Sequence, residues 1–500
     1  MRAIHSIENF GAIDADNDEL LFDCFEDHEA YINAVNCKKY LIVGRKGSGK
    51  TAIFKKLITT KEPKYFCFGH TFSDYPWHYH DKQARIGIPD FDKYTHSWKY
   101  LILLTISKII LNQDMSLPYD MPSMESLLKI EKFVIDTYGT RDPDVTQIFT
   151  PTKTLKLKPT FEIDLKSLLK VGISPENIPI SELPTIVQEV NLNLMNLVIN
   201  SLSPENRYYI CFDQLDLGFD PENPDYANRL IGLLLACRDI NIRAKELSKK
   251  LFICVFLRND IYDELHFEDK NKITENFLSM IEWDTPRTNK TLKSLMEKRF
   301  NKVLRNNSDE YISWENVFDE TKEMTGHQTK YQHIIDRTYL RPRDIIKFTN
   351  EVLTQYKTRA QNEVVEKIDN IDVNSSKVEY SDYFLRELDD EIHKHLENYK
   401  SYLEIFKSIG VLQFSRDEFL EAYKAKEVSF PEINNGIEIL KQLFEFSVIG
   451  YYRAGGRGYG GSEYIYKYKD PRAQFDEAAG KFRLHPGLME VLELKKYVKS

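Results

Sequence analysis

Three short, continuously apolar runs in the first 290 residues predict strands that are buried on both faces. They cover residues 40–43, 208–212 and 251–257, and none of them alternates as a half-exposed strand would. Behind the first run, Ile53, Phe54 and Leu57 continue at helical spacing. A strand, a loop and a helix are therefore predicted in succession from residue 40 onwards.

Residues 395–500 show a different pattern, three amphipathic helical segments followed by two alternating strands. Helices are predicted around residues 399–406, 419–423 and 433–444, with Ser415 as the N-cap of the second. The strands VIGYYR and EYIYKYK flank the glycine-rich segment AGGRGYGGS. Three helices and a hairpin with a basic tip predict a winged-helix-like domain.

The loop behind the first strand reads GRKGSGKT and matches G-x-x-x-x-G-K-[ST], the pattern of a phosphate-binding loop. Its glycines at 44, 47 and 49 are expected to adopt positive φ, so that backbone amides approach the phosphate oxygens. Lys50 would reach the β- and γ-phosphates, and Thr51 would ligate magnesium. No guanine-reading N-K-x-D motif is present, so we expect ATP. The predicted nucleotide-binding residues here are Gly44, Arg45, Lys46, Gly47, Ser48, Gly49, Lys50, Thr51 and Ile53.

A phosphate-binding loop requires a carboxylate at the end of a neighbouring strand, and Asp213 ends the second apolar run. We expect Asp213 to hold magnesium with Thr51, directly or through water; an ordinary aspartate in a turn is the alternative. Many ATPases carry a glutamate next as general base, whereas Gln214 cannot accept a proton. Asp216 is then the expected base, and slow hydrolysis or a nucleotide-held switch are the alternatives.

Two later polar segments are candidate sensors of the γ-phosphate. Arg258 and Asn259 follow the third apolar run, where a capping turn is the alternative interpretation. Arg341 and Arg343 bracket Pro342, a residue that suits the first turn of a helix. An arginine at such a helix start can reach a phosphate, and a solvated basic cluster is the alternative.

In this order the segments resemble AAA+ and STAND ATPases, in particular Orc/Cdc6-like initiators and their prokaryotic STAND relatives. The resemblance rests on residues 44–51, 208–216, 252–260 and 341–344, and FDQLD resembles the initiators' D-E-x-D with Gln replacing Glu. IEWD at 281–284 resembles their final core strand. FLRNDIYDEL with YLRPRD also resembles bacterial P-loop ATPases, some found near phage-defence genes. The resemblance implies an α/β fold with a helix-flanked parallel sheet, a helical lid and ATP, but no substrate.

The expected domain organisation has four parts. We predict an ATPase core over 1–289 with an insertion at about 115–182, a helical lid over 290–358, a connector over 359–394 and the winged-helix-like domain over 395–500. Inside the insertion, residues 155–165 alternate as a strand would, with Pro159 at an edge or bend.

Composition narrows the setting of the protein. The formal net charge of −9 argues against a surface devoted to nucleic acid, although a local basic patch is compatible with it. The cysteines form no CxxC pair, the N-terminus is too polar for a signal peptide, and no apolar run approaches the length of a membrane span. We expect a cytoplasmic protein that does not contact a membrane.

Two functions follow as hypotheses. The first is an ATP-hydrolysing switch that oligomerises, acts through a separate effector protein and, as the resemblance suggests, serves bacterial stress or phage defence. The second is a DNA-binding protein that ATP stabilises with little turnover. Arg453, Arg457, Lys467 and Lys469 suit a wing on duplex DNA, but the third helix lacks a cationic stripe, so protein contact is an equal alternative.

Overall fold

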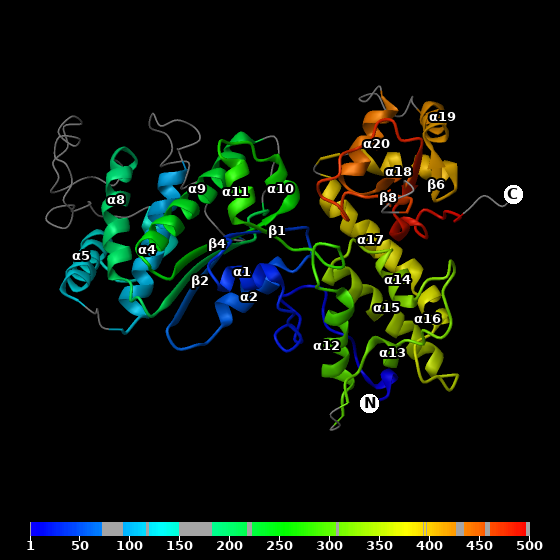
Figure 1. Cartoon of the computed structure of the whole chain (residues 1–500), viewed down its shortest axis with the longest axis horizontal. Coiled ribbons are helices and arrows are strands. Elements are labelled where there is room, and N and C mark those ends of the chain that lie inside the picture. The colour runs from blue at the N-terminus through cyan, green and yellow to red at the C-terminus, as the bar shows by residue number, and fades with distance from the viewer. Residues whose placement is uncertain are drawn as a thin grey trace. The chain divides into compact units, whose positions relative to one another are not determined.

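A computed structural model describes residues 2–72, 94–116, 120–149, 183–217, 223–306, 310–393, 395–396, 398–426, 435–455 and 461–496. The chain forms two compact units (Figure 1). One unit, called the sheet unit below, consists of residues 27–45 and 50–281. The other, called the helical unit, consists of residues 1–26, 46–49 and 282–500.

The sheet unit is built on a five-stranded parallel sheet in the order β2-β3-β4-β1-β5. The three apolar runs form β1 (Leu41–Gly44), β3 (Arg207–Asp213) and β4 (Leu251–Arg258), as predicted. β2 (Tyr65–Thr71) and β5 (Leu278–Met280) complete the sheet, so the final strand ends just before the segment IEWD. β4 lies between β1 and β3, so the expectation that the Asp213 strand neighbours the loop strand is wrong. In a parallel sheet, however, both strands still end at the same edge.

Helices surround this sheet and bury its apolar strands. They are α1 (Glu29–Val35), α2 (Lys50–Thr59), α4 (Thr95–Asn112), α5 (Met121–Tyr138), α6 (Val145–Phe149), α8 (Leu183–Ser201), α9 (Pro224–Glu246), α10 (Asn259–Glu264) and α11 (Lys270–Phe277). The apolar helix α4 is almost entirely buried and packs against α8 and α9 (Figure 1). The described part of the expected insertion is helical, and the alternating residues 155–165 lie outside the described residues.

The first part of the helical unit contains the expected lid. Its elements are η1 (Ile4–Ser6), α12 (Leu292–Leu304), α13 (Trp314–Val317), α14 (Lys330–Ile335), α15 (Pro342–Ala360), α16 (Asn370–Ser375) and α17 (Lys377–Ile392). Pro342 opens α15, as predicted from its fixed φ. Residues 359–394, expected to form a connector, include α16 and α17. Tyr380 of α17 is buried and stacks on Phe348 of α15, with ring centroids 4.1 Å apart.

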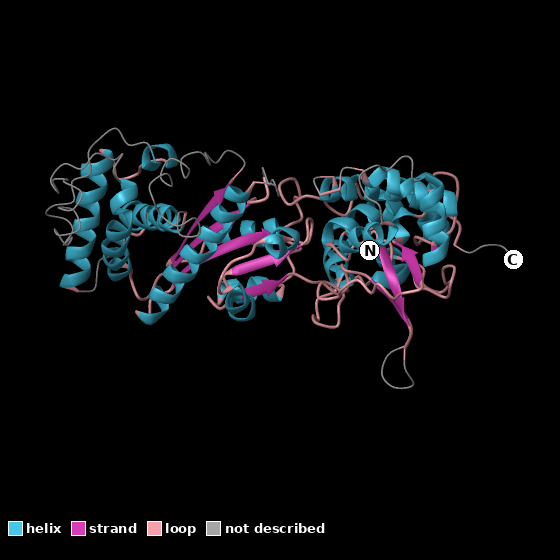
Figure 2. Cartoon of the chain, turned by 90° about the horizontal axis from the view of Figure 1, so that it is seen from above, coloured by secondary structure: helices cyan, strands magenta, loops and turns pink. Residues whose placement is uncertain are grey.

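The winged-helix prediction is confirmed by the C-terminal part of this unit. Helices α18 (Tyr399–Ile409), α19 (Arg416–Lys426) and α20 (Gly436–Glu445) precede the hairpin of β7 (Ile449–Arg453) and β8 (Glu463–Ile465), which Figure 2 shows. Ser415 caps α19 as predicted, since its hydroxyl accepts from the Glu418 amide at 3.2 Å. The short strands β6 (Gln413–Ser415) and β9 (Lys481–Leu484), which complete the sheet β6-β9-β7-β8, were not predicted. The turn η4 (Pro486–Leu488) follows β9.

None of the helices in the described parts of the chain is long and apolar enough to cross a membrane.

A buried ion pair fixes the N-terminal segment within the helical unit. Arg299 of α12 donates to Asp18 at 2.6 Å and to the Phe10 carbonyl at 2.9 Å. The side chains of Arg299 and Asp18 are only 5% and 3% exposed. Gly11 makes this approach feasible, because its φ is +107° and an added Cβ would lie 1.9 Å from the guanidinium. Residues 1–26 therefore belong to this unit.

We predict that Asp18→Ala destabilises the protein by about 3–5 kcal/mol, because it leaves a buried guanidinium unpaired. Lys302→Ala is the matched control. It removes an ion pair to Asp23 in which both side chains are about half exposed, and should leave the denaturation midpoint near the wild-type value. Equal urea midpoints for the two variants would contradict a structural role for the Asp18–Arg299 pair.

Candidate functional site

The phosphate-binding loop joins β1 to α2 at the carboxyl edge of the sheet. Gly47 and Gly49 have φ of +77° and +109°, as expected, whereas Gly44 ends β1 and is absent from the positive-φ residues. Space explains Gly47 further, because an added Cβ would lie 3.0 Å from Cβ of Arg343 in the same unit. Lys50 is the first residue of α2, so the loop lies at the N-terminus of this helix. Backbone amides and the positive end of the helix dipole at such a position favour a bound anion.

Lys50 carries its charge in a desolvated position. Its ammonium donates to the carbonyls of Gly44 and Arg45, both at 2.9 Å. Burial lowers the pKa of Lys50 to about 8, and the carboxylates of Asp216 and Asp213 oppose that shift. An anion placed beside this ammonium would favour its charged form.

Asp213 ends β3 and is 2% exposed. Burial raises its pKa to about 6, although a hydrogen bond from Thr51, the amide of Gln214 and the charge of Lys50 act in the opposite direction. Within the described part of the chain, Oδ2 of Asp213 has no hydrogen-bond partner. A buried carboxylate oxygen without a donor, next to a threonine hydroxyl, supplies two oxygen ligands of the kind that a hard divalent cation takes. Thr51 and Asp213 therefore fit magnesium.

The predicted base and sensor form one ion-pair cluster. Arg258 contacts Asp260 at 2.5 Å and Asp216 at 3.5 Å. Asp216 must therefore leave this guanidinium, or share it, to accept a proton from water. Gln214, between the two aspartates, has a left-handed φ of +61°. Arg258 and Asn259 stand at the start of α10, where Arg258 makes no side-chain cap.

Arg341 and Arg343 lie beside loop residues 46–49, which belong to the same unit. Arg341 is 1% exposed, binds Asp344 through two 2.8 Å hydrogen bonds, contacts Glu391 and donates to the Lys46 carbonyl at 2.9 Å. These partners engage four of the five N–H donors of Arg341 and indicate a structural role. Arg343 is more accessible and pairs with Glu387 at 3.0 Å.

Three further residues, two in the loop and one on α2, were predicted to bind nucleotide. Ile53 is buried on α2 and packs in the core of the sheet unit. Ser48 is buried, and its carbonyl accepts from the indole of Trp283 at 3.0 Å. Lys46 is held by Asp390 of α17 at 2.5 Å, with Glu387 at 3.8 Å.

The carboxylates of α17 were missed in the sequence. Glu387, Asp390 and Glu391 are spaced three and four residues apart, so they share one helix face and bind Lys46, Arg343 and Arg341. That spacing was visible, but it falls in a segment expected to be a connector. No local pattern indicates which cations the face meets.

Of the four cations expected on the wing, the three that the structure describes each form an ion pair. Arg453 pairs with Glu463 at 2.7 Å, Lys467 with Glu445 at 3.2 Å and Lys469 with Asp336 at 3.8 Å, while Arg457 lies outside the described residues. The exposed side chains on described α20 include Glu438, Lys441 and Glu445. This helix therefore has no cationic stripe for a DNA groove.

Residues 290–389 match the family described as the FunZ-associated C-terminal helical domain, a stretch that covers α12 to most of α17. No curated protein matches the chain. The solved structure of the Aeropyrum pernix Orc1 protein in complex with DNA is similar over 95% of this chain and 92% of that one, at 12% identity and a TM-score of 0.33. A likeness this distant carries no argument about function.

Proposed function

We propose that the protein binds ATP with magnesium at residues 44–51 and uses the bound nucleotide as a conformational switch with slow hydrolysis. The observation that carries this proposal is that Lys50, at the start of α2, and the buried Asp213, at the end of β3, lie near enough for their charges to influence each other's pKa. Desolvation disfavours both charges, and a magnesium–phosphate ligand would supply an opposite charge for each. Two desolvated charges lower the stability of the folded protein unless a charged ligand binds to them.

Thr51 and Asp213 would hold magnesium, whose charge would screen the phosphates and polarise the bond to the leaving group. The chain's own contribution to hydrolysis is to orient the attacking water. Gln214 can orient a water but not deprotonate it, and Asp216 is engaged by Arg258. These two facts support slow turnover.

The carboxylate face of α17 supports the switch. Lys46 of the loop pairs with both Asp390 and Glu387, and Arg343 pairs with Glu387. A phosphate on the loop would compete with these carboxylates for the same cations. Because α17 immediately precedes the winged-helix-like domain in the chain, release of its acidic face is a route by which nucleotide state reaches that domain.

A DNA-binding protein stabilised by ATP is the alternative, and Gln214 remains its support. The paired wing cations and the mixed surface of α20 favour protein contact instead, consistent with homo-oligomerisation or an effector partner. A role in stress or phage defence rests on the sequence resemblance alone. Duplex DNA affinity that falls steeply with salt would favour the alternative.

We predict that Lys50→Ala removes ATP binding, because the variant lacks the ammonium that would contact the β- and γ-phosphates. The protein should stay folded, because the lost charge is one that burial disfavours. Saturating ATP with magnesium, at about 100 times its Kd, should stabilise the wild type by roughly 2.7 kcal/mol and the variant by nothing measurable. Lys61→Ala, an exposed lysine beyond α2, is the control and should keep the full thermal shift. An unchanged shift in Lys50→Ala would refute the loop assignment.

We predict that Asp213→Asn stabilises the ligand-free protein at pH 7 by up to about 3 kcal/mol. The folded pKa of about 6 lies above the ordinary aspartate pKa of 3.8, so the wild type loses stability as the pH rises from about 4 to about 6, and each pKa unit corresponds to about 1.4 kcal/mol. The gain should vanish below about pH 4, where the aspartate is protonated in both states. The variant should also lose any magnesium dependence of ATP binding. A variant less stable than wild type at pH 7 would show that Asp213 is structural.

The source of hydrolysis can be tested with two isosteric variants. If Asp216 is the base, Asp216→Asn should lower turnover by roughly a hundred- to ten-thousand-fold while ATP still binds. If the protein switches without turnover, Asp216→Asn should change nothing, and Gln214→Glu should create or raise ATPase activity. Robust wild-type hydrolysis that survives Asp216→Asn would contradict both versions and make Asp260 the first alternative base.

Arg343→Ala should leave ATP affinity largely intact but make ATP and ADP equivalent in limited proteolysis, because it removes the cation for which Glu387 and the γ-phosphate would compete. Glu387→Gln should produce the ATP-type digestion pattern without nucleotide. Lys347→Ala, which breaks the pair to Glu351 one turn further along α15, is the control and should digest as wild type. Patterns that still differ between ATP and ADP in Arg343→Ala would exclude this arginine as the sensor.

A further inference from the structure

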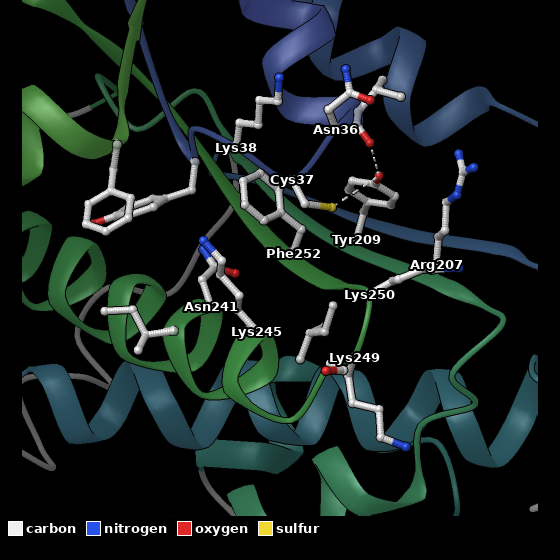
Figure 3. Close-up of a pocket in the computed structure, with 16 residues that line it drawn as sticks. Asn36, Cys37, Lys38, Arg207, Tyr209, Asn241, Lys245, Lys249, Lys250 and Phe252 are labelled. Carbon is white, nitrogen blue, oxygen red and sulfur yellow. Dashed lines mark hydrogen bonds between the residues drawn. The ribbon is translucent and has the colours of Figure 1, made fainter.

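A second hollow lies at the opposite edge of the parallel sheet from the phosphate-binding loop. It has a volume of about 490 Å³ and is lined where β3 and β4 begin, by the segment before β1 and by the end of α9 (Figure 3). β3 has seven residues, and at about 3.3 Å per residue roughly 20 Å separates this hollow from Asp213. The hollow is therefore distinct from the proposed ATP site.

The walls of this hollow carry cations and no carboxylate. Its lining contains Lys38, Arg207, Lys245, Lys249 and Lys250. Lys249 donates to the Leu202 carbonyl at 2.6 Å, and Figure 3 shows its side chain running away from the rings of Tyr209 and Phe252. The other four are exposed, and within the described residues none of them forms an ion pair. In a chain of net charge −9, four cations without an ion-pair partner give this hollow a locally positive surface that would attract an anion.

The floor of the hollow is aromatic and uncharged. Tyr209 and Phe252 lie edge to face with ring centroids 6.4 Å apart (Figure 3), and Tyr40 and Phe277 add a second pair at 5.3 Å. The Tyr209 hydroxyl donates to the Val35 carbonyl at 2.8 Å and contacts the thiol of Cys37 at 3.6 Å. Burial raises the pKa of both Tyr209 and Cys37, so neither brings a negative charge into the hollow.

The carboxyl end of a helix usually repels an anion through its unsatisfied carbonyl groups. At the end of α9 this repulsion is reduced, because backbone amides bond to these carbonyls. Ser248, with a left-handed φ of +55°, lets its amide donate to the Lys245 carbonyl at 3.0 Å. The Lys249 amide donates to the Ala244 carbonyl at 2.9 Å. The last carbonyls of the helix are thus satisfied by the backbone.

We propose that this hollow binds a small organic anion in which an aromatic or heteroaromatic ring carries a phosphate or similar group. The volume lies in the range of small-molecule sites, and an apolar floor with a few charged groups is the usual composition of such sites. The ring would lie on the aromatic floor, and the anionic group would meet Lys245, Lys250 and Arg207. Lys38 completes the cationic rim.

The test uses 1-naphthyl phosphate as probe, with 1-naphthol and inorganic phosphate as its separate halves. In calorimetry on the full chain, the intact probe should bind at least tenfold tighter than either half. The double variant Lys245→Glu/Lys250→Glu should weaken binding at least tenfold, whereas the exposed lysines outside the hollow in Lys61→Glu/Lys302→Glu should leave it unchanged. Thermal melting would verify that both double variants are folded, as expected for exposed positions.

Other outcomes would overturn the proposal. Equal affinity in the Lys245→Glu/Lys250→Glu variant would show that the hollow is not the site, and inorganic phosphate binding as tightly as the probe would reduce it to a simple anion patch. Loss of probe binding in the Lys50→Ala variant would show that the probe binds at the phosphate-binding loop. Because the hollow does not involve Lys50, binding that persists in Lys50→Ala supports this site whether or not the loop binds ATP.

Discussion

The proposed nucleotide site depends on two opposite charges, those of Lys50 and Asp213, that are desolvated at the carboxyl edge of the sheet. Burial lowers the pKa of the first and raises that of the second, so each is less stable in its charged form than it would be in water. The parallel strands hold the loop and Asp213 at one edge, and the helix start directs backbone amides towards the same place. Core packing around β3 and β4 thus maintains a site that costs stability when it has no charged ligand.

Cations held by carboxylates also organise the part of the helical unit around α15 and α17. Lys46 and Arg343 have carboxylate partners on α17, and Arg341 is fixed by three polar partners at the start of α15. The arginine with the fewest constraints is therefore the one suited to sense a phosphate. Arg341 instead keeps the start of α15 against Lys46, which makes it a positioning residue.

The sheet and the loop could be predicted because their signals are local. A continuous apolar run, a glycine-rich loop and a helical repeat lie within residues 40–57, and the structure forms them within one or two residues of the prediction. The winged-helix-like domain was predictable for the same reason. Gly44 was wrongly assigned a positive φ because the motif does not distinguish a strand end from a turn.

Other features depend on contacts between distant segments. The insertion of β4 between β1 and β3, the pairing of β6 with β9 and the ion pair between Asp18 and Arg299 join residues tens to hundreds of positions apart. Periodicity carries no information about such pairings. The carboxylates of α17 show this most clearly, since Glu387 and Asp390 pair with Lys46, which lies more than three hundred residues earlier in the chain.

The most direct measurement of the central claim is calorimetric titration of the wild-type protein with ATP, with and without magnesium. The account predicts one site per chain and at least tenfold tighter binding in the presence of magnesium, because Asp213 and Thr51 would share the cation with the phosphates. Absence of binding, or equal affinity with and without magnesium, would contradict it.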